Sequence, residues 1–253
     1  SVQQFQNQEM QEEFCKIARM IKESGINLKI VFNTDGLTEE DFKECKDQLE
    51  KESIVVNKIA VLDWYFDSVK KLCPSVKIID SVNNMKNTLE GFREIRHDYD
   101  EIVIGRHFIR NENVLRVVQD ELHAKTVLLL NNGCSHICGG CRTQEYCRQS
   151  YEKERDRYSP EYVYALQSIM PYELHENFFD ISRIDLFKLS TRNADTEFIH
   201  KCLDSYIYNN AREYVEKSSH HYLLWSRLIW HMQYFDSFNY DRIYQLKREI
   251  CKC

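Results

Sequence analysis

Four cysteines lie within one 14-residue window, and their number and spacing are typical of a metal-binding site. The window has the sequence Cys134-Ser-His-Ile-Cys138-Gly-Gly-Cys141-Arg-Thr-Gln-Glu-Tyr-Cys147, which is C-x3-C-x2-C-x5-C. The two glycines allow the tight turn that would bring neighbouring thiolates to one centre. Four thiolates would hold a [4Fe–4S] cluster or a structural zinc ion, and the simplest alternative is a loop of free thiols. We predict that at least three of the four sulfur atoms share one metal centre.

The triplet Cys134, Cys138 and Cys141 also has the C-x3-C-x2-C spacing of radical S-adenosylmethionine enzymes. In those enzymes the triplet follows the first strand of the barrel. Here five predicted strands precede the triplet and one follows it, so its position argues against this resemblance.

The composition limits the kind of protein. With 253 residues and 43% hydrophobic content the chain can bury a sizeable core, and a net charge of −6 gives no general electrostatic case for binding nucleic acid. No apolar run approaches the roughly 20 residues of a membrane span. We therefore expect a soluble, cytoplasmic protein without a membrane partner. The cysteines outside the window that fall in helical patterns, where we expect buried thiols, are Cys15, Cys45, Cys73 and Cys202.

Short β-branched strands alternate with helical segments along most of the chain, which predicts parallel βα units. Gly25 marks a helix end and Thr38 a helix start. The predicted strands cover residues 28–32, 58–62, 76–79, 101–104, 126–130 and 184–188. The fold class is therefore α/β, with TIM-barrel-like parallel βα units that form an incomplete barrel.

Polar or charged residues follow the predicted strands, at the end where parallel α/β folds place their functional sites. These residues are Asn33, Asp63, Ser81, Asn83, Arg106, Asn131, Asn132 and Lys188. A polar residue at the start of a loop is the simpler explanation for any one of them, but the whole set favours a site. The residues expected to face one common cavity and bind substrate are Asn33, Asp63, Ser81, Asn83, Arg106 and Lys188.

After Arg192 the chain is predicted to be helical, with helices at residues 195–217 and 222–234. Both carry aromatic residues at helical spacing, which is typical of a core. We therefore expect a barrel-like domain over residues 1–192 and a helical extension over residues 193–253. The closing Cys251-Lys-Cys253 is interpreted as a pair of free thiols.

The strand ends, taken in order, resemble the collagenase-like peptidase family U32, whose members are barrels related to the (β/α)8 type. Residues 28–33 are similar to the family's strand that ends in asparagine. Residues 79–83, with Asn87, are similar to its Ser-x-x-x-Asn segment, and residues 102–106 resemble its Leu-x-Arg-Glu strand, with His107 in place of the glutamate.

The resemblance continues through the later strands. Residues 126–134 resemble the family's strand that leads to its first cysteine. Residues 184–192, Ile-Asp-Leu-Phe-Lys-Leu-Ser-Thr-Arg, resemble its Ile-Asp-x-x-Lys-Ile-Glu-Gly-Arg segment, and the helix over residues 198–208 occupies the place of the helix that follows. The match adds His107 and Arg192 to the candidate substrate-binding residues.

The resemblance, over roughly residues 10–210, implies further features of the molecule. The family has two βα units before the segment that starts here at Val2, so we expect a barrel open on one side and a protein partner that covers this side. Two departures from the family pattern concern the site. The family spreads its cysteines more widely, and Leu-Ser-Thr replaces Ile-Glu-Gly before Arg192.

Two functions follow from these observations. In the first, the chain is an iron–sulfur or metal-containing barrel enzyme, since family members resemble proteins that hydroxylate RNA bases or quinone precursors without oxygen. Its substrate would be a small anionic molecule or RNA, and no protease motif is present. In the second, the chain is a non-catalytic binding or scaffold subunit, in which a zinc ion pins the loop from Cys134 to Cys147. Colour and metal content distinguish the two.

Overall fold

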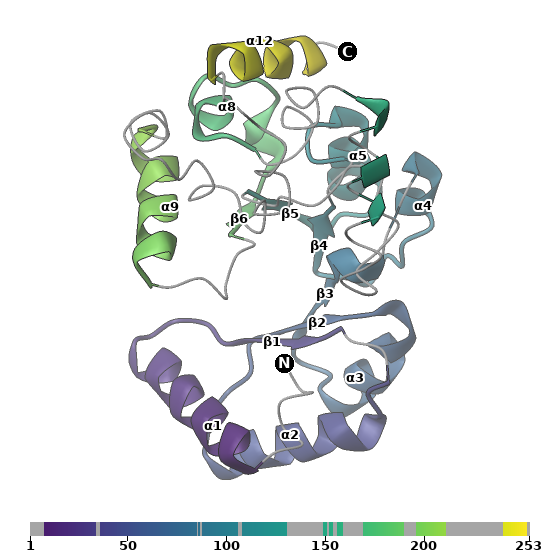
Figure 1. The fold of residues 1–253 in the computed structure, drawn as a ribbon. Helices are drawn as coiled ribbons and strands as arrows, with labels where there is room; N and C mark the ends of the chain where they lie inside the picture. Colours follow the sequence, from purple (N-terminus) through teal and green to yellow (C-terminus); the bar gives the residue numbers. More distant parts are fainter. Residues whose placement is uncertain are drawn as a thin grey trace. The chain divides into compact units, whose positions relative to one another are not determined.

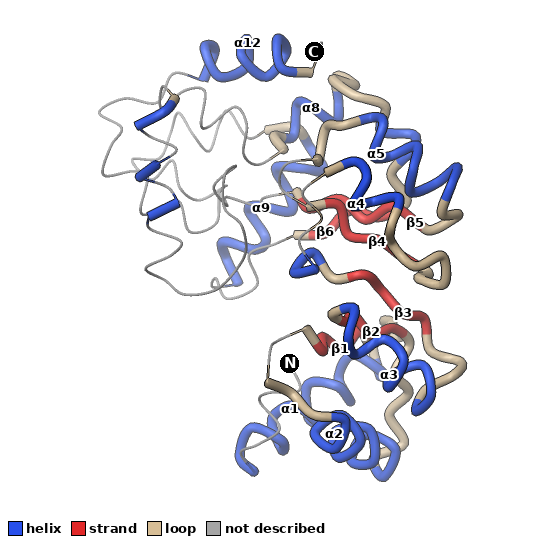
Figure 2. Tube along the Cα trace, turned by 90° about the vertical axis from the view of Figure 1, so that its right-hand side faces the viewer, coloured by secondary structure: helices blue, strands red, loops and turns tan. Residues whose placement is uncertain are grey.

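Six parallel strands and the helices between them build an incomplete α/β barrel, with further helices at the C-terminus (Figure 1). The computed structural model describes residues 8–33, 36–84, 86, 88–105, 108–130, 149–150, 152–153, 156–158, 169–189, 196–210 and 240–251. The strands follow one another in the sheet in the order β1-β2-β3-β4-β5-β6. They are the red segments of Figure 2. The predicted fold class is confirmed.

The chain divides into two compact units. The N-terminal unit comprises residues 1–84 and 96–103 and contains most of β4 (Glu101–Ile104). Its other elements are α1 (Gln8–Glu23), β1 (Lys29–Phe32), α2 (Glu39–Lys51), β2 (Lys58–Val61), η2 (Asp63–Tyr65), α3 (Phe66–Leu72), β3 (Lys77–Asp80) and η3 (Val82–Asn84).

The C-terminal unit comprises residues 85–95 and 104–253. Its described elements are α4 (Leu89–Arg93), α5 (Glu112–Arg116), η4 (Val117–Glu121), β5 (Lys125–Leu129), α8 (Pro171–His175), η5 (Ile181–Arg183), β6 (Leu186–Lys188), α9 (Thr196–Tyr208) and α12 (Tyr240–Ile250). The helix predicted at residues 222–234 lies outside the described residues.

Local sequence signals set several of these boundaries. Thr38 caps α2 through a capping box: its hydroxyl accepts from the Asp41 N–H, and the Asp41 carboxylate accepts from the Thr38 N–H. Gly25 follows α1 with a φ of +68°, a left-handed conformation that glycine adopts without steric cost. Asn209, with a φ of +53°, follows α9, so the helix predicted for residues 195–217 ends at Tyr208.

The sheet of the N-terminal unit has one face covered by helices and one face turned away from them. Phe32 packs against Phe42 of α2 at 5.1 Å between ring centroids, so Phe32 faces the helices. Val61 and Asp80 are its partners in the parallel register and share that face. Because side chains alternate along a strand, the next residues, Asn33 and Ser81, turn to the opposite face.

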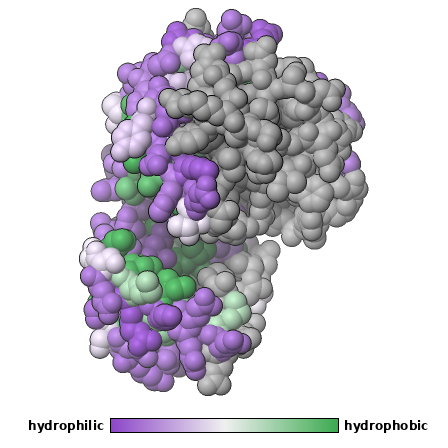
Figure 3. Space-filling model, turned by 60° about the vertical axis from the view of Figure 1, so that its left-hand side comes forward, coloured by the Kyte–Doolittle hydropathy of each residue, from purple (hydrophilic) through white to green (hydrophobic). Residues whose placement is uncertain are grey.

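The surface of the N-terminal unit is mostly hydrophilic. Figure 3 shows an apolar area on this unit, surrounded by hydrophilic residues. The large apolar side chains of this unit that are most exposed are Ile26, Val55, Trp64 and Met20. Among the described helices, none is long and apolar enough to cross a membrane.

Candidate functional site

Asn33, Ser81 and Asn83 come from two strand ends and meet in what we call the amide–hydroxyl cluster. The Asn33 Nδ2 donates to Ser81 Oγ at 2.7 Å. The Asn83 backbone N–H donates to the same oxygen at 3.3 Å, and Asn83 Nδ2 donates to the Asn33 carbonyl at 3.3 Å. Ser81 is only 3% exposed, whereas both asparagines are half-buried. The structure therefore brings three of the predicted site residues together.

The parallel register explains how residues 48 positions apart come into contact. Phe32 aligns with Val61, and Val61 aligns with Asp80, so Asn33 and Ser81 follow at the same level of β1 and β3. Strand β2 lies between them, and neighbouring strands are about 4.8 Å apart. The Asn33–Ser81 hydrogen bond therefore closes over the carboxyl end of β2.

Asp63 belongs to a second network, which faces the helices. Tyr99 donates its hydroxyl to Asp63 Oδ1 at 2.8 Å, and the Tyr99 ring makes an edge contact with Phe66 of α3. The Asp63 N–H donates to Asn84 Oδ1, and Asn84 Nδ2 donates to the buried Asp80 carboxylate. Burial, Asp80 and Asp63 raise the pKa of Tyr99 above its ordinary value, so this tyrosine stays a donor. Asp63 thus has hydrogen-bond partners other than the members of the amide–hydroxyl cluster, and its part in a common cavity stays a prediction.

The remaining predicted site residues belong to the C-terminal unit. Lys188 ends β6, where its carbonyl accepts from the Leu130 N–H, and its side chain is half-buried. The predictions that lie outside the described residues concern Arg106, His107, Asn131, Asn132 and Arg192. Their part in a common cavity stays a prediction.

The predicted metal ligands Cys134, Cys138, Cys141 and Cys147 also lie outside the described residues. Within the described ranges, no group of three or more His, Cys, Asp or Glu side chains is placed to hold a metal ion. The cysteines predicted to be buried thiols, Cys15, Cys45, Cys73 and Cys202, are buried. Burial raises the pKa of Cys45 to about 12, so this thiol is not a reactive thiolate.

A buried charge cluster in the C-terminal unit was not expected from the sequence. Glu173 of α8 is fully buried and accepts from Arg110 Nε at 2.5 Å, from Arg110 Nη2 at 3.0 Å and from Lys247 Nζ at 2.9 Å. It also accepts from the Met170 N–H at 2.7 Å. The cluster thereby ties together the segment after β4, helix α8 and helix α12. The local sequence signal concerned helix capping alone. Glu173 is the third residue of a helix that begins with Pro171, a position from which a glutamate caps the helix start.

Burial and mutual charge determine the protonation of this cluster. Burial raises the pKa of Glu173, but Arg110 and Lys247 hold it below its ordinary value. Burial and the neighbouring Arg110 lower the pKa of Lys247 to about 8. The Lys247 side chain is 1% exposed, so a substrate in solution cannot reach its amine. The cluster therefore stabilises the docking of α12 and has no group accessible for catalysis.

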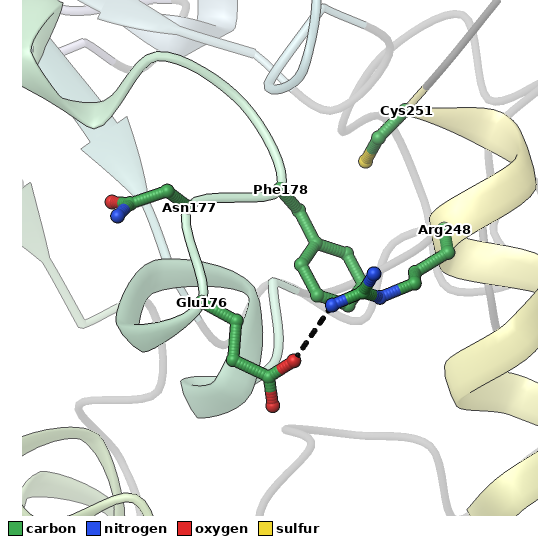
Figure 4. A pocket seen from close by; sticks show the side chains of 5 residues that line it. All are labelled: Glu176, Asn177, Phe178, Arg248 and Cys251. Carbon is green, nitrogen blue, oxygen red and sulfur yellow. Dashed lines mark hydrogen bonds and ion pairs between the residues drawn. The ribbon is translucent and has the colours of Figure 1, made fainter.

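A small cavity lies between the turn after α8 and the end of α12 (Figure 4). Its volume is about 150 Å³, below the roughly 300 Å³ at which small-molecule pockets begin. Arg248 lies over the Phe178 ring at 4.8 Å and pairs with Glu176 at 3.0 Å, while the Asn177 side chain points away from them. Since its charged groups pair with each other, we interpret this cavity as a packing crevice.

The fold and the strand-end residues define an incomplete α/β barrel with a candidate site at the carboxyl ends of its strands. No protein-family model matches the chain, and no curated protein matches it. Among solved structures, that of the U32 peptidase Mk0906 is similar over 72% of this chain and 76% of that chain, with 14% sequence identity and a TM-score of 0.44.

Proposed function

We propose that this chain is a metal-containing barrel enzyme of the U32 peptidase type that modifies a small molecule or RNA without using oxygen. The observation that supports the proposal is the position of the cysteine window. Strand β5 ends at Leu129, and the Leu130 N–H still pairs with the Lys188 carbonyl of β6. In the sequence the first cysteine follows four residues after Leu130, and barrel sites form at the carboxyl ends of strands.

The chemistry of the four donors fits the proposed centre. Cys134, Cys138, Cys141 and Cys147 would hold a [4Fe–4S] cluster, since four thiolates within a short window are its usual ligands. When bound, such a cluster supplies one-electron chemistry. In the C-terminal unit, Lys188 and the predicted Arg106 would hold an anionic part of a substrate by charge-assisted hydrogen bonds.

Metal analysis after anaerobic purification tests the proposal. We expect a brown protein with about four iron and four sulfide per chain. Cys138→Ser and Cys141→Ser should each lose most of the iron. Cys73→Ser, which removes a buried thiol outside the window, is the matched control and should keep it. A colourless protein with one zinc per chain would support the zinc-pinned scaffold instead, and a protein without either metal would remove both functions.

A further inference from the structure

The amide–hydroxyl cluster has hydrogen-bonding groups that find no partner in the described part of the chain. Each asparagine donates one side-chain N–H within the cluster, to Ser81 Oγ or to the Asn33 carbonyl. Among the described residues, nothing donates to Asn33 Oδ1 or Asn83 Oδ1, and nothing accepts the second N–H of either side chain. Each carboxamide therefore offers one acceptor and one donor, and both side chains are half-buried rather than fully solvated.

The cluster itself carries no ionisable side chain, since its members are two asparagines and a serine. The carboxylates of the neighbouring strand ends belong to the second network, where Asp80 accepts from Asn84 and Asp63 accepts from Tyr99. The strand lysines lie at the other end of the sheet, because Lys29, Lys58 and Lys77 align in register at the first positions of β1, β2 and β3. Four residues of strand separate Lys29 from Asn33, roughly 13 Å.

Among these three lysines, Lys58 on the middle strand β2 is neutralised by an ion pair. Lys58 forms an ion pair with Glu101 of β4, whose side chain is buried. Its charge is therefore not available to a ligand at the carboxyl ends of the strands. The side chains of the cluster are neutral, and the strand lysines lie at the opposite ends of β1, β2 and β3.

We infer that the amide–hydroxyl cluster binds the amide group of a small molecule, through paired hydrogen bonds with the Asn33 and Asn83 carboxamides. A carboxamide presents a donor and an acceptor side by side, as an amide ligand does, whereas an anion supplies acceptors only and an ammonium group donors only. The inference rests on the proposed function only in taking the strand ends as the substrate site. The residues that carry it all lie in the N-terminal unit.

Side-chain amide signals of protein labelled with ¹⁵N-asparagine provide a direct test. The full chain is titrated in parallel with acetamide, methylammonium, acetate and inorganic phosphate. We expect acetamide to shift the signals of Asn33 and Asn83 in a saturable way, with shifts several-fold larger than those from the other three probes. Asn57, whose Oδ1 accepts from the Leu28 N–H before β1 and β2, is the internal reference and should not move.

Two variants make the test specific. Ser81→Ala removes the shared acceptor and should weaken the acetamide response several-fold, and circular dichroism checks that the variant is folded. Asn33→Asp replaces the donor and should abolish the response. The inference is overturned if acetate, phosphate or methylammonium gives the larger shift, if no probe moves Asn33 and Asn83, or if Asn57 shifts equally.

The metal analysis and the acetamide titration test the two proposals independently, so either proposal can be refuted without the other. Cys138→Ser protein without metal should still respond to acetamide if the inference holds, even where the iron analysis has refuted the proposed enzyme. Conversely, a protein with full iron content that does not respond to acetamide refutes the ligand class and leaves the proposed function intact.

Discussion

At the residue scale, Glu173 is the side chain whose removal should cost most. Glu173→Gln would leave Arg110 and Lys247 buried beside a neutral amide, and breaking a buried ion pair in this way costs about 3–5 kcal/mol. Urea unfolding of wild type and variant measures the free energy of unfolding. Glu176→Gln, which loses the more exposed pair with Arg248, is the matched control and should cost no more than about 1 kcal/mol. Equal losses in both variants would contradict the role assigned to Glu173.

Thr126 provides a prediction of opposite sign. It is fully buried in β5, and in the described part of the chain its Oγ1 has no hydrogen-bond partner. Thr126→Val replaces the hydroxyl with a methyl group of similar shape and removes the cost of burying an unpaired polar atom. We expect the variant to be more stable by about 1 kcal/mol in urea unfolding. A destabilised variant would show that the hydroxyl has a partner.

The residue scale also shows what the sequence could predict about the site. Asn33 and Ser81 were predicted to share a site because both follow strands, and parallel strands end at one edge. The Tyr99 hydroxyl that donates to Asp63 comes from 36 residues away. The Arg110–Glu173 pair spans 63 residues. No local pattern reports such a contact, because only the folded chain brings the partners together.

At the element scale, the strands were predicted well because most of them are short runs rich in β-branched residues between turn residues. The helix after residue 195 was predicted too long, since the left-handed conformation of Asn209 that ends it is not specific to that residue type. Residues 112–121 form α5 and, directly after it, the π-helical turn η4. Hydrophobic spacing does not distinguish an α-helical turn from a π-helical one.

The capping box of α2 gives a prediction for a single element. Thr38→Ala removes the oxygen that accepts from the Asp41 N–H at 3.1 Å. Loss of such a cap costs about 1 kcal/mol, and the α2 amides near the start of the helix should exchange faster with solvent. Hydrogen exchange resolved by segment measures both effects. The same exchange rates in wild type and variant, or faster exchange only outside α2, would contradict the capping role.

At the scale of the whole molecule, the charge cluster makes stability depend on pH. The pKa of Lys247 is about 8 in the folded chain and about 10.5 in the unfolded chain. Between these values the unfolded chain binds more protons, so this lysine makes the free energy of unfolding rise with pH. Below pH 8 both states are protonated, and its contribution does not change. Other groups act in the opposite direction, because burial raises the pKa values of Cys45 and Tyr206.

A pair of proteins isolates the contribution of Lys247 from these opposing groups. Lys247→Met keeps the length and apolar stem of the side chain and leaves the two-point contact between Arg110 and Glu173 in place. Groups common to both proteins cancel in the difference between their free energies of unfolding. From pH 8 to pH 9.5 wild type should gain about 2 kcal/mol relative to Lys247→Met, at 1.36 kcal/mol per pH unit. Urea unfolding at four pH values from 7 to 9.5 measures this difference. A constant difference would mean that Lys247 keeps its ordinary pKa and is solvated in the folded chain, and α12 would then not be docked through a buried lysine.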